Sequence, residues 1–152
     1  MNADIADVVQ IARTAADFEW TWTVDDVDRF TSSAGWNVKN RRELGATLVT
    51  NLRIEEPLAQ AFFGNDLKYI LVFLADYVED ADPARTAELV DHFADLSQEM
   101  IAVLGSPTAQ RPGREPNMKW ARPDVVVELL GYEFGFQLKL ENPKYREWQD
   151  RF

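Results

Sequence analysis

The chain has 152 residues, with 26 acidic and 16 basic side chains, one histidine, no cysteine and a formal net charge of −10. This length predicts a single domain over residues 1–152 with a sizeable core, and the absence of cysteine excludes disulfides, thiolate metal centres and thiol catalysis. The negative charge argues against DNA or RNA binding, because a phosphate backbone repels an acidic surface, so composition favours binding to another protein over catalysis.

The N-terminal residues carry neither a basic segment nor a long apolar run, so no signal peptide is expected. No window approaches the roughly 18 consecutive apolar residues of a membrane span. The longest apolar run, Tyr69 to Ala75, has the length of a strand. We therefore expect a cytoplasmic protein with no membrane partner.

Two helices are predicted near the N-terminus. From Asp4 to Ala16 apolar residues recur at helical spacing. A second helix is predicted to begin at Thr23, where Thr23-x-x-Asp26 resembles a capping box, and to end at Gly35.

Strands are predicted for the next part of the chain. A short strand over 36–39 and a turn over 40–43 precede a stretch over 44–54 in which apolar and polar residues alternate, as in a half-buried antiparallel strand. Two more strands are predicted over 59–63 and 67–74, and the second reads as central because both of its faces are apolar.

A long helix is the clearest predicted element, because Asp82-Pro83 places a capping residue before a proline at the first helical position. Gly105 would end this helix. Its apolar stripe consists of Leu89, Phe93, Leu96, Met100 and Leu104.

The segment over 106–123 carries four prolines and no periodicity, so a long loop is expected there. A hairpin over 125–130 and 134–140 follows, and Asn142-Pro143 would start a last short helix with Tyr145, Trp148 and Phe152 on one face. The predicted fold is therefore α+β. An antiparallel sheet of about five to six strands would pack against one long helix, with helices at both ends of the chain.

Motifs for catalysis and cofactor binding are missing from the sequence: it has no nucleophile elbow, phosphate loop or dinucleotide-binding glycine motif. We read the single histidine, His92, as an exposed or boundary residue of the long helix. The acidic run over 76–82 offers oxygen ligands for Ca²⁺ or Mg²⁺ but lacks EF-hand spacing, so a solvated loop is predicted. A carboxylate pair for glycosidase-type chemistry stays open, because it needs only spatial proximity. We expect no catalytic residue, no metal and no cofactor.

Charge is distributed unevenly along the chain. Residues 54–104 hold 11 acids against Lys68 and Arg85, a balance of −9, whereas 36–53 and 105–123 each have a balance of +3. An acidic surface can steer a basic partner, and solubility alone is the other explanation. The acids of the long helix that alternate with its apolar stripe are Glu88, Asp91, Asp95 and Glu99.

Five tryptophans stand at predicted element ends or in loops, where they either close the edges of the core or anchor a partner. Trp120, in the proline-rich segment, is predicted to be the most exposed. The full set of predicted partner-binding residues is Tyr77, Glu79, Asp80, Glu88, Asp91, Asp95, Glu99 and Trp120.

The order of several motifs carries a resemblance. They are Trp22-Thr23-Val24-Asp25-Asp26-Val27, Gly35-Trp36, the helix ending Val103-Leu104-Gly105-Ser106-Pro107, and then Trp120 and a final hairpin. Across most of the chain this order resembles small acidic actinobacterial proteins of unknown function, some of which resemble immunity proteins of polymorphic or type VII-secreted toxins. The resemblance implies a protein that binds and blocks a cognate toxin, with no catalytic residue carried over.

The element order is also similar to the class I type III secretion chaperone fold, which implies a homodimer that binds an extended segment of a partner. We therefore expect a non-enzymatic protein-binding domain, first as an antagonist of a basic toxin domain and second as a chaperone-like dimer. An enzyme with carboxylate or metal-dependent chemistry is the third reading.

Overall fold

The computed structural model describes residues 2–76, 83–113, 115–132 and 135–145. Three helices are present in this part of the chain: α1 (Ile5–Asp17), α2 (Asp26–Ala34) and α3 (Pro83–Leu104). The strands of the first half are β1 (Asn37–Arg42), β2 (Gly45–Val49), β3 (Leu58–Phe63) and β4 (Leu67–Phe73). Those of the second half are β5 (Ala109–Arg111), β6 (Asn117–Ala121), β7 (Val126–Tyr132) and β8 (Gly135–Glu141).

The eight strands form one antiparallel sheet in the order β1-β2-β3-β4-β8-β7-β6-β5. It consists of two four-stranded meanders, β1–β4 and β5–β8, that meet where β4 pairs with β8. At this joint Leu71 lies opposite Lys139 and Val72 opposite Leu138. Helix α3 lies in the connection between the two meanders and contacts β8 of the second one.

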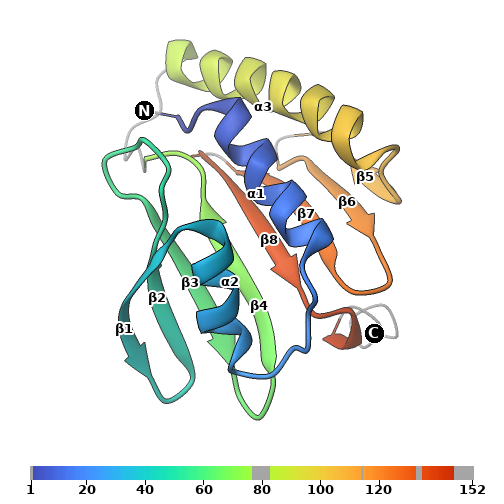
Figure 1. The fold of residues 1–152 in the computed structure, drawn as a ribbon. Helices are drawn as coiled ribbons and strands as arrows, with labels where there is room; N and C mark the ends of the chain where they lie inside the picture. Colours follow the sequence, from blue (N-terminus) through green and yellow to red (C-terminus); the bar gives the residue numbers. More distant parts are fainter. Residues whose placement is uncertain (1, 77–82, 114, 133–134, 146–152) are drawn as a thin grey trace.

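Helices cover one face of the sheet. Figure 1 shows α1 and α2 in front of the strands and α3 along one end of the sheet, with no helix of the described chain behind it. Helix α1 packs on α3 and on β7, and α3 also contacts β8. Strand residues that point toward the helices form the core, among them Leu48, Ile70, Leu129 and Leu138, all fully buried. We call the opposite side of the sheet the open face.

Two helix ends confirm the sequence prediction. Gly35 has φ +75°, and the N–H of Trp36 donates to the carbonyl of Thr31 at 2.8 Å, which closes α2 in a left-handed turn. Gly105 has φ +87°, and its N–H donates to the carbonyl of Ile101 at 2.8 Å at the end of α3. No helix among the described residues combines the length and apolarity that crossing a membrane would require.

The α+β class and the antiparallel sheet are confirmed, but the expected five to six strands are wrong, because the sheet has eight. The predicted loop over 106–123 contains β5 and β6. The prolines of this segment predicted a loop, but they lie where they do not interrupt the strands. Pro112 and Pro116 lie in the connection between these strands, and Pro107 and Pro123 lie outside them, where the missing N–H interrupts no ladder.

Two boundaries in the first half also differ from the prediction. Strand β1 runs through residues 40–42, where a turn was expected, because these residues pair with β2 across a bulge. The strand expected over 44–54 ends at Val49, although the alternation of buried and exposed side chains continues to Ile54. Of the expected C-terminal helix the structure describes residues 143–145, which are helical, and Trp148 and Phe152 lie outside the described residues.

Candidate functional site

Helix α3 presents three different surfaces. Its buried side carries Leu89, Leu96 and Met100, which belong to the core. On one exposed side, which we call the acidic stripe, Glu88, Asp91, Asp95 and Glu99 follow one another at helical spacing. On the other exposed side, which we call the apolar flank, lie Val90, Ala94 and Ile101. Val90 is 62% exposed and Ile101 37%.

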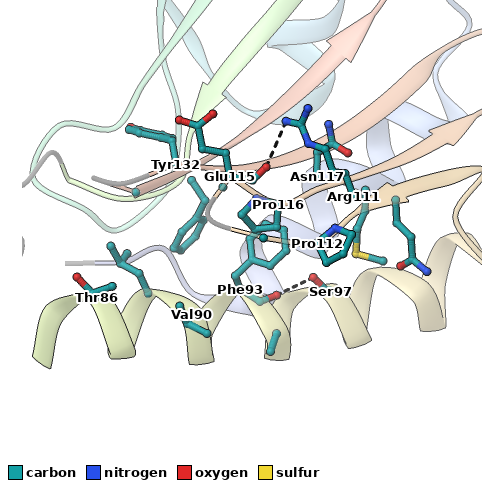
Figure 2. Close-up of a pocket in the computed structure, with 18 residues that line it drawn as sticks. Thr86, Val90, Phe93, Ser97, Arg111, Pro112, Glu115, Pro116, Asn117 and Tyr132 are labelled. Carbon is teal, nitrogen blue, oxygen red and sulfur yellow. Dashed lines mark hydrogen bonds between the residues drawn. The ribbon is translucent and has the colours of Figure 1, made fainter. Parts of the chain in front are cut away.

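A groove lies between α3 and the β5–β8 half of the sheet, with a volume of about 1400 Å³ (Figure 2). The helix contributes Val90 and Phe93 to its lining, and the strands and the β5–β6 connection contribute the opposite wall. The apolar side chains around it are Leu89, Val90, Phe93, Ala94, Pro112, Pro116, Met118 and Phe136. Val90 and Ala94 of the apolar flank therefore border a hollow instead of packing against another element.

Gly131 on β7 sets the depth of this groove. A Cβ at this position would come within 2.9 Å of the Pro116 ring and 3.4 Å of the Phe93 ring, so only glycine leaves room for both. The N–H of Gly131 donates to the carbonyl of Pro116 at 2.8 Å and holds the β5–β6 connection against β7. Phe93 and Pro116 are thus brought side by side from segments that are remote in sequence.

Polar side chains also line the groove: Thr86, Ser97, Gln110, Arg111, Glu115, Asn117 and Tyr132. Ser97 donates to the carbonyl of Phe93 within α3 at 2.7 Å, and Arg111 donates to the carbonyl of Glu115 at 3.3 Å, as the dashed lines in Figure 2 mark. The described lining residues include no histidine, aspartate or lysine, and no group of three metal-ligating side chains occurs in the described chain. A groove lined in this way suits the burial of apolar side chains.

The acidic residues predicted for partner binding are brought together as expected. Glu88, Asp91, Asp95 and Glu99 are all exposed on α3. Of these, Glu88 also pairs with Arg85 at 3.2 Å. Their stripe lies on the side of the helix away from the groove, so one flat partner surface cannot contact both. Tyr77, Glu79 and Asp80 lie outside the described residues.

The expectation that Trp120 is exposed is wrong, because this side chain is only 2% exposed. Trp120 lies on β6, where the alternation of the strand points it and Met118 toward the helices. Its indole N–H donates to the carbonyl of Gly105 at 2.9 Å and so ties β6 to the end of α3. The side chain therefore belongs to the core and cannot anchor a partner in this conformation.

His92 is half-buried, as expected of a boundary residue. Its Nε2 lies 3.1 Å from the carbonyl oxygen of Ala3, and its ring stacks on Phe136 at 5.2 Å. These contacts join α3 to the N-terminal segment and to β8, and they account for the residue without a catalytic role.

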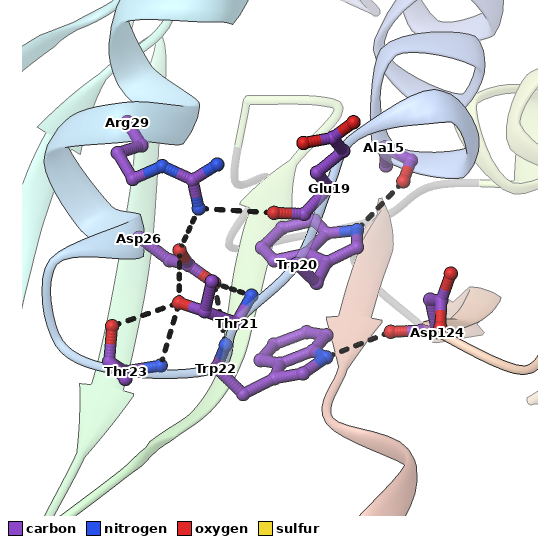
Figure 3. A network of polar contacts seen from close by, with 9 residues as sticks. All are labelled: Ala15, Glu19, Trp20, Thr21, Trp22, Thr23, Asp26, Arg29 and Asp124. Carbon is purple, nitrogen blue, oxygen red and sulfur yellow. Dashed lines mark hydrogen bonds and ion pairs between the residues drawn. The ribbon is translucent and has the colours of Figure 1, made fainter.

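A second cluster of polar contacts surrounds Asp26 at the start of α2 (Figure 3). The carboxylate is fully buried and accepts hydrogen bonds from the N–H groups of Thr21 and Trp22 at 2.8 and 2.7 Å and from the Thr21 hydroxyl at 2.8 Å. It also pairs with Arg29. The predicted capping box is therefore shifted: α2 begins at Asp26, which bonds residues before Thr23.

The indole N–H groups of two tryptophans beside this cluster donate hydrogen bonds to backbone carbonyls at the edge of the core. Trp20 donates to the carbonyl of Ala15, and Trp22 donates to the carbonyl of Asp124, both at 2.8 Å. Together with the Trp120 contact, this confirms for three tryptophans the reading in which they close the edges of the core. The Asp26 cluster is structural, which leaves the groove as the candidate site.

The profile of a family of unknown function, DUF6301, matches residues 6–142. The chain belongs to DUF6301. The matched part of this DUF6301 protein runs from α1 through β8, so the groove, the acidic stripe and the Asp26 cluster all lie within it. No curated protein and no solved structure matches the chain.

Proposed function

We propose that this DUF6301 protein is a non-enzymatic protein-binding domain that takes an apolar segment of a partner protein into the groove beside α3. The observation that carries the proposal is the position of the apolar flank. Single exposed apolar residues are ordinary, but Val90, Ala94 and Phe93 line one continuous hollow together with Pro116 and other apolar side chains.

The size and chemistry of the groove support a protein segment as its ligand. Small-molecule pockets are roughly 300–1,000 Å³ and enclose most of their ligand, whereas this groove is larger, about 1400 Å³, and open along α3. The polar side chains that line it, among them Arg111, Glu115 and Asn117, include both signs of charge and could orient a segment without demanding one ligand charge. Each apolar side chain that a partner inserted would remove further apolar surface from water.

Within this proposal, the narrower role is that of an immunity-type antagonist of a toxin. The acidic stripe supports it, because a negative field speeds the encounter with a basic protein domain and disfavours acidic ones. The stripe and the groove lie on different sides of α3, so we assign them different tasks. The acidic stripe would increase the rate of association, and the groove would hold the bound partner.

A secretion-chaperone-like role is the second candidate, and one observation favours it. Strand β5 borders the groove and stands at the end of the strand order, where it pairs only with β6 in the described chain. An extended segment could therefore occupy the groove and add to this edge.

Binding should depend on the apolar flank, and a charge placed there tests this. We expect Val90→Glu to weaken partner binding at least tenfold, because a buried carboxylate without a counter-ion opposes an apolar contact. The wild-type protein, expressed with the products of adjacent genes in its native host, would first be used to recover the partner. The affinity of the purified pair would then be measured by calorimetry.

Ala102→Glu is the matched control, since it adds the same charge to an exposed position of α3 on the side of the acidic stripe. It should leave affinity within about twofold of the wild type. Failure to recover any stable partner, or equal affinities for the wild type and Val90→Glu, would contradict the proposal.

A further inference from the structure

The open face of the sheet carries an apolar surface on its first meander. Five half-buried side chains form it, and we call them the open strip: Val49, Leu58, Phe62, Leu71 and Phe73. Their neighbours along the strands, such as Leu48, Ala59 and Val72, are fully buried on the side of the helices. Because successive side chains of a strand point to opposite faces, the open strip points away from all three helices.

The strand register places the open strip around one polar residue, because Gln60 lies between Leu58 and Phe62 on β3, opposite Leu71, and accepts hydrogen bonds from Arg42 and Thr47. Val49 lies opposite Leu58 across β2 and β3, and Phe62 lies opposite Tyr69 across β3 and β4. The rings of Phe62 and Tyr69 stack at 4.7 Å. On the far side of β4, Leu71 and Phe73 lie opposite Lys139 and Gln137 of β8.

Charges on the adjoining part of the open face neutralise one another. Lys119 pairs with Glu128 at 3.6 Å across β6 and β7, and Lys139 pairs with Glu141 at 2.9 Å along β8. The Lys139 ammonium also lies 4.6 Å from the centre of the Tyr69 ring. These four side chains add no net charge to the open face of a chain whose total is −10.

We propose that the open strip is a homodimer interface, in which a second copy of this chain packs sheet against sheet about a two-fold axis near β3 and β4. Two protomers of −10 repel each other over most of their surface, so they meet most favourably where each is apolar or internally neutralised. Aligned sheets of this kind pack about 10 Å apart through interdigitated side chains. The proposal is independent of the groove and does not require a partner there.

The available area is sufficient for such a dimer. The open strip lies on the three strands β2–β4, and a sheet-on-sheet contact would also cover their more polar neighbours β1, β8 and β7. These six strands together span roughly 29 Å and are roughly 20 Å long, which gives roughly 600 Å² per protomer for the whole contact. The total, about 1,200 Å², reaches the lower end of specific protein interfaces. We therefore expect a reversible dimer whose population rises with protein concentration.

Sedimentation equilibrium of the full chain over a range of concentrations tests this interface. The expected result is a species with twice the mass of one chain, and Leu58→Glu should raise the dissociation constant roughly a hundredfold, because it would bury two carboxylates at a position opposite the apolar Val49. Leu71→Glu should weaken the dimer to a smaller extent, because Lys139 lies opposite Leu71 and partly neutralises the new carboxylate. Both side chains point away from the core, so circular dichroism should show that the variants remain folded.

Leu71→Met and Val90→Glu are the controls. The first keeps an apolar side chain of similar volume in the open strip and should leave the dimer intact. The second adds a charge at the groove and should also leave the dimer intact, so loss of partner binding and loss of dimerisation can be told apart. A monomer at every concentration would overturn the proposal, and so would a dimer that neither Leu71→Glu nor Leu58→Glu weakens.

Discussion

Asp26 illustrates how one residue can hold a connection that has no regular structure. Its carboxylate is completely buried and receives the backbone N–H groups of both Thr21 and Trp22. Trp22 has φ +58°, an uncommon conformation for a bulky residue. The hydrogen bond from the Trp22 N–H to Asp26 helps to retain this conformation, so the side chain of Asp26 determines the path from α1 to α2.

Asp26→Ala should lower the free energy of unfolding by about 2 kcal/mol, because it leaves two part-buried N–H donors without their acceptor and removes the partner of the partly exposed Arg29. Urea denaturation followed by tryptophan fluorescence measures this change. The neighbouring Asp25 is exposed and makes no side-chain capping bond, so Asp25→Ala should change stability by less than about 0.5 kcal/mol. Equal effects of the two substitutions would contradict this account.

Asp76 adds a dependence on pH. Burial would raise the pKa of its carboxyl, but hydrogen bonds from the N–H groups of Glu55 at 3.1 Å and Glu56 at 3.0 Å contribute to a net pKa below the usual value. Because the pKa of Asp76 is lower in the folded than in the unfolded protein, the ionised carboxylate stabilises the fold at pH values above the unfolded pKa of about 3.9. This stabilisation is lost as the pH falls through the folded-state pKa.

In Asp76→Asn this contribution should be missing. We expect the wild type to be more stable than the variant at neutral pH, and the difference to shrink as the pH is lowered below about 4. Denaturant unfolding at a series of pH values measures it. A stability difference that stays constant down to acidic pH would show that the ionised carboxylate does not provide it.

Among the elements, α3 shows how far the sequence could predict this structure. Its start at Pro83, its end at Gly105 and its outward acids followed from local signals, and all are confirmed. Phe93 was expected in the core stripe, yet it is half-buried and lines the groove. The helix repeat gives the direction of a side chain, whereas the depth of its burial depends on what packs opposite.

Strands β5 and β6 could not be predicted from the sequence. Strand β5 has three residues and β6 has five, too few to display a clear alternation, and prolines stand on either side of both. Because these strands were read as a loop, the opposite wall of the groove and the buried position of Trp120 could not be predicted. Val90, an apolar residue outside the predicted apolar stripe of α3, was a local signal of the groove that the sequence offered.

Phe93→Ala should distinguish a groove residue from a core residue. Full burial of a phenylalanine in a core would make its removal cost about 3–5 kcal/mol. For the half-buried Phe93 we expect a smaller loss of unfolding free energy, about 1–2 kcal/mol, together with weakened partner binding. Thermal and urea unfolding measure the first effect, and Leu96→Ala, which truncates a fully buried side chain of the same helix, provides the core reference.

At the scale of the whole molecule, surfaces of different chemistry lie on different sides. The acidic stripe and the groove occupy different sides of α3, and the open strip lies on the opposite side of the sheet. A chain with one net charge of −10 therefore has an acidic surface, an apolar hollow and a sheet face on which two lysines are paired with glutamates. In this arrangement a dimer formed through the open strip would leave both grooves accessible.

The joint between β4 and β8 also determines the order in which the molecule can fold. Within each meander, paired strands are neighbours in sequence, whereas the joint pairs residues about 70 positions apart and must close a loop that contains α3. The local hairpins can form before this closure, and until it occurs β4 and β8 are apolar strands with free edges, which favours aggregation. Closure of the joint removes that hazard and completes the groove in the same step.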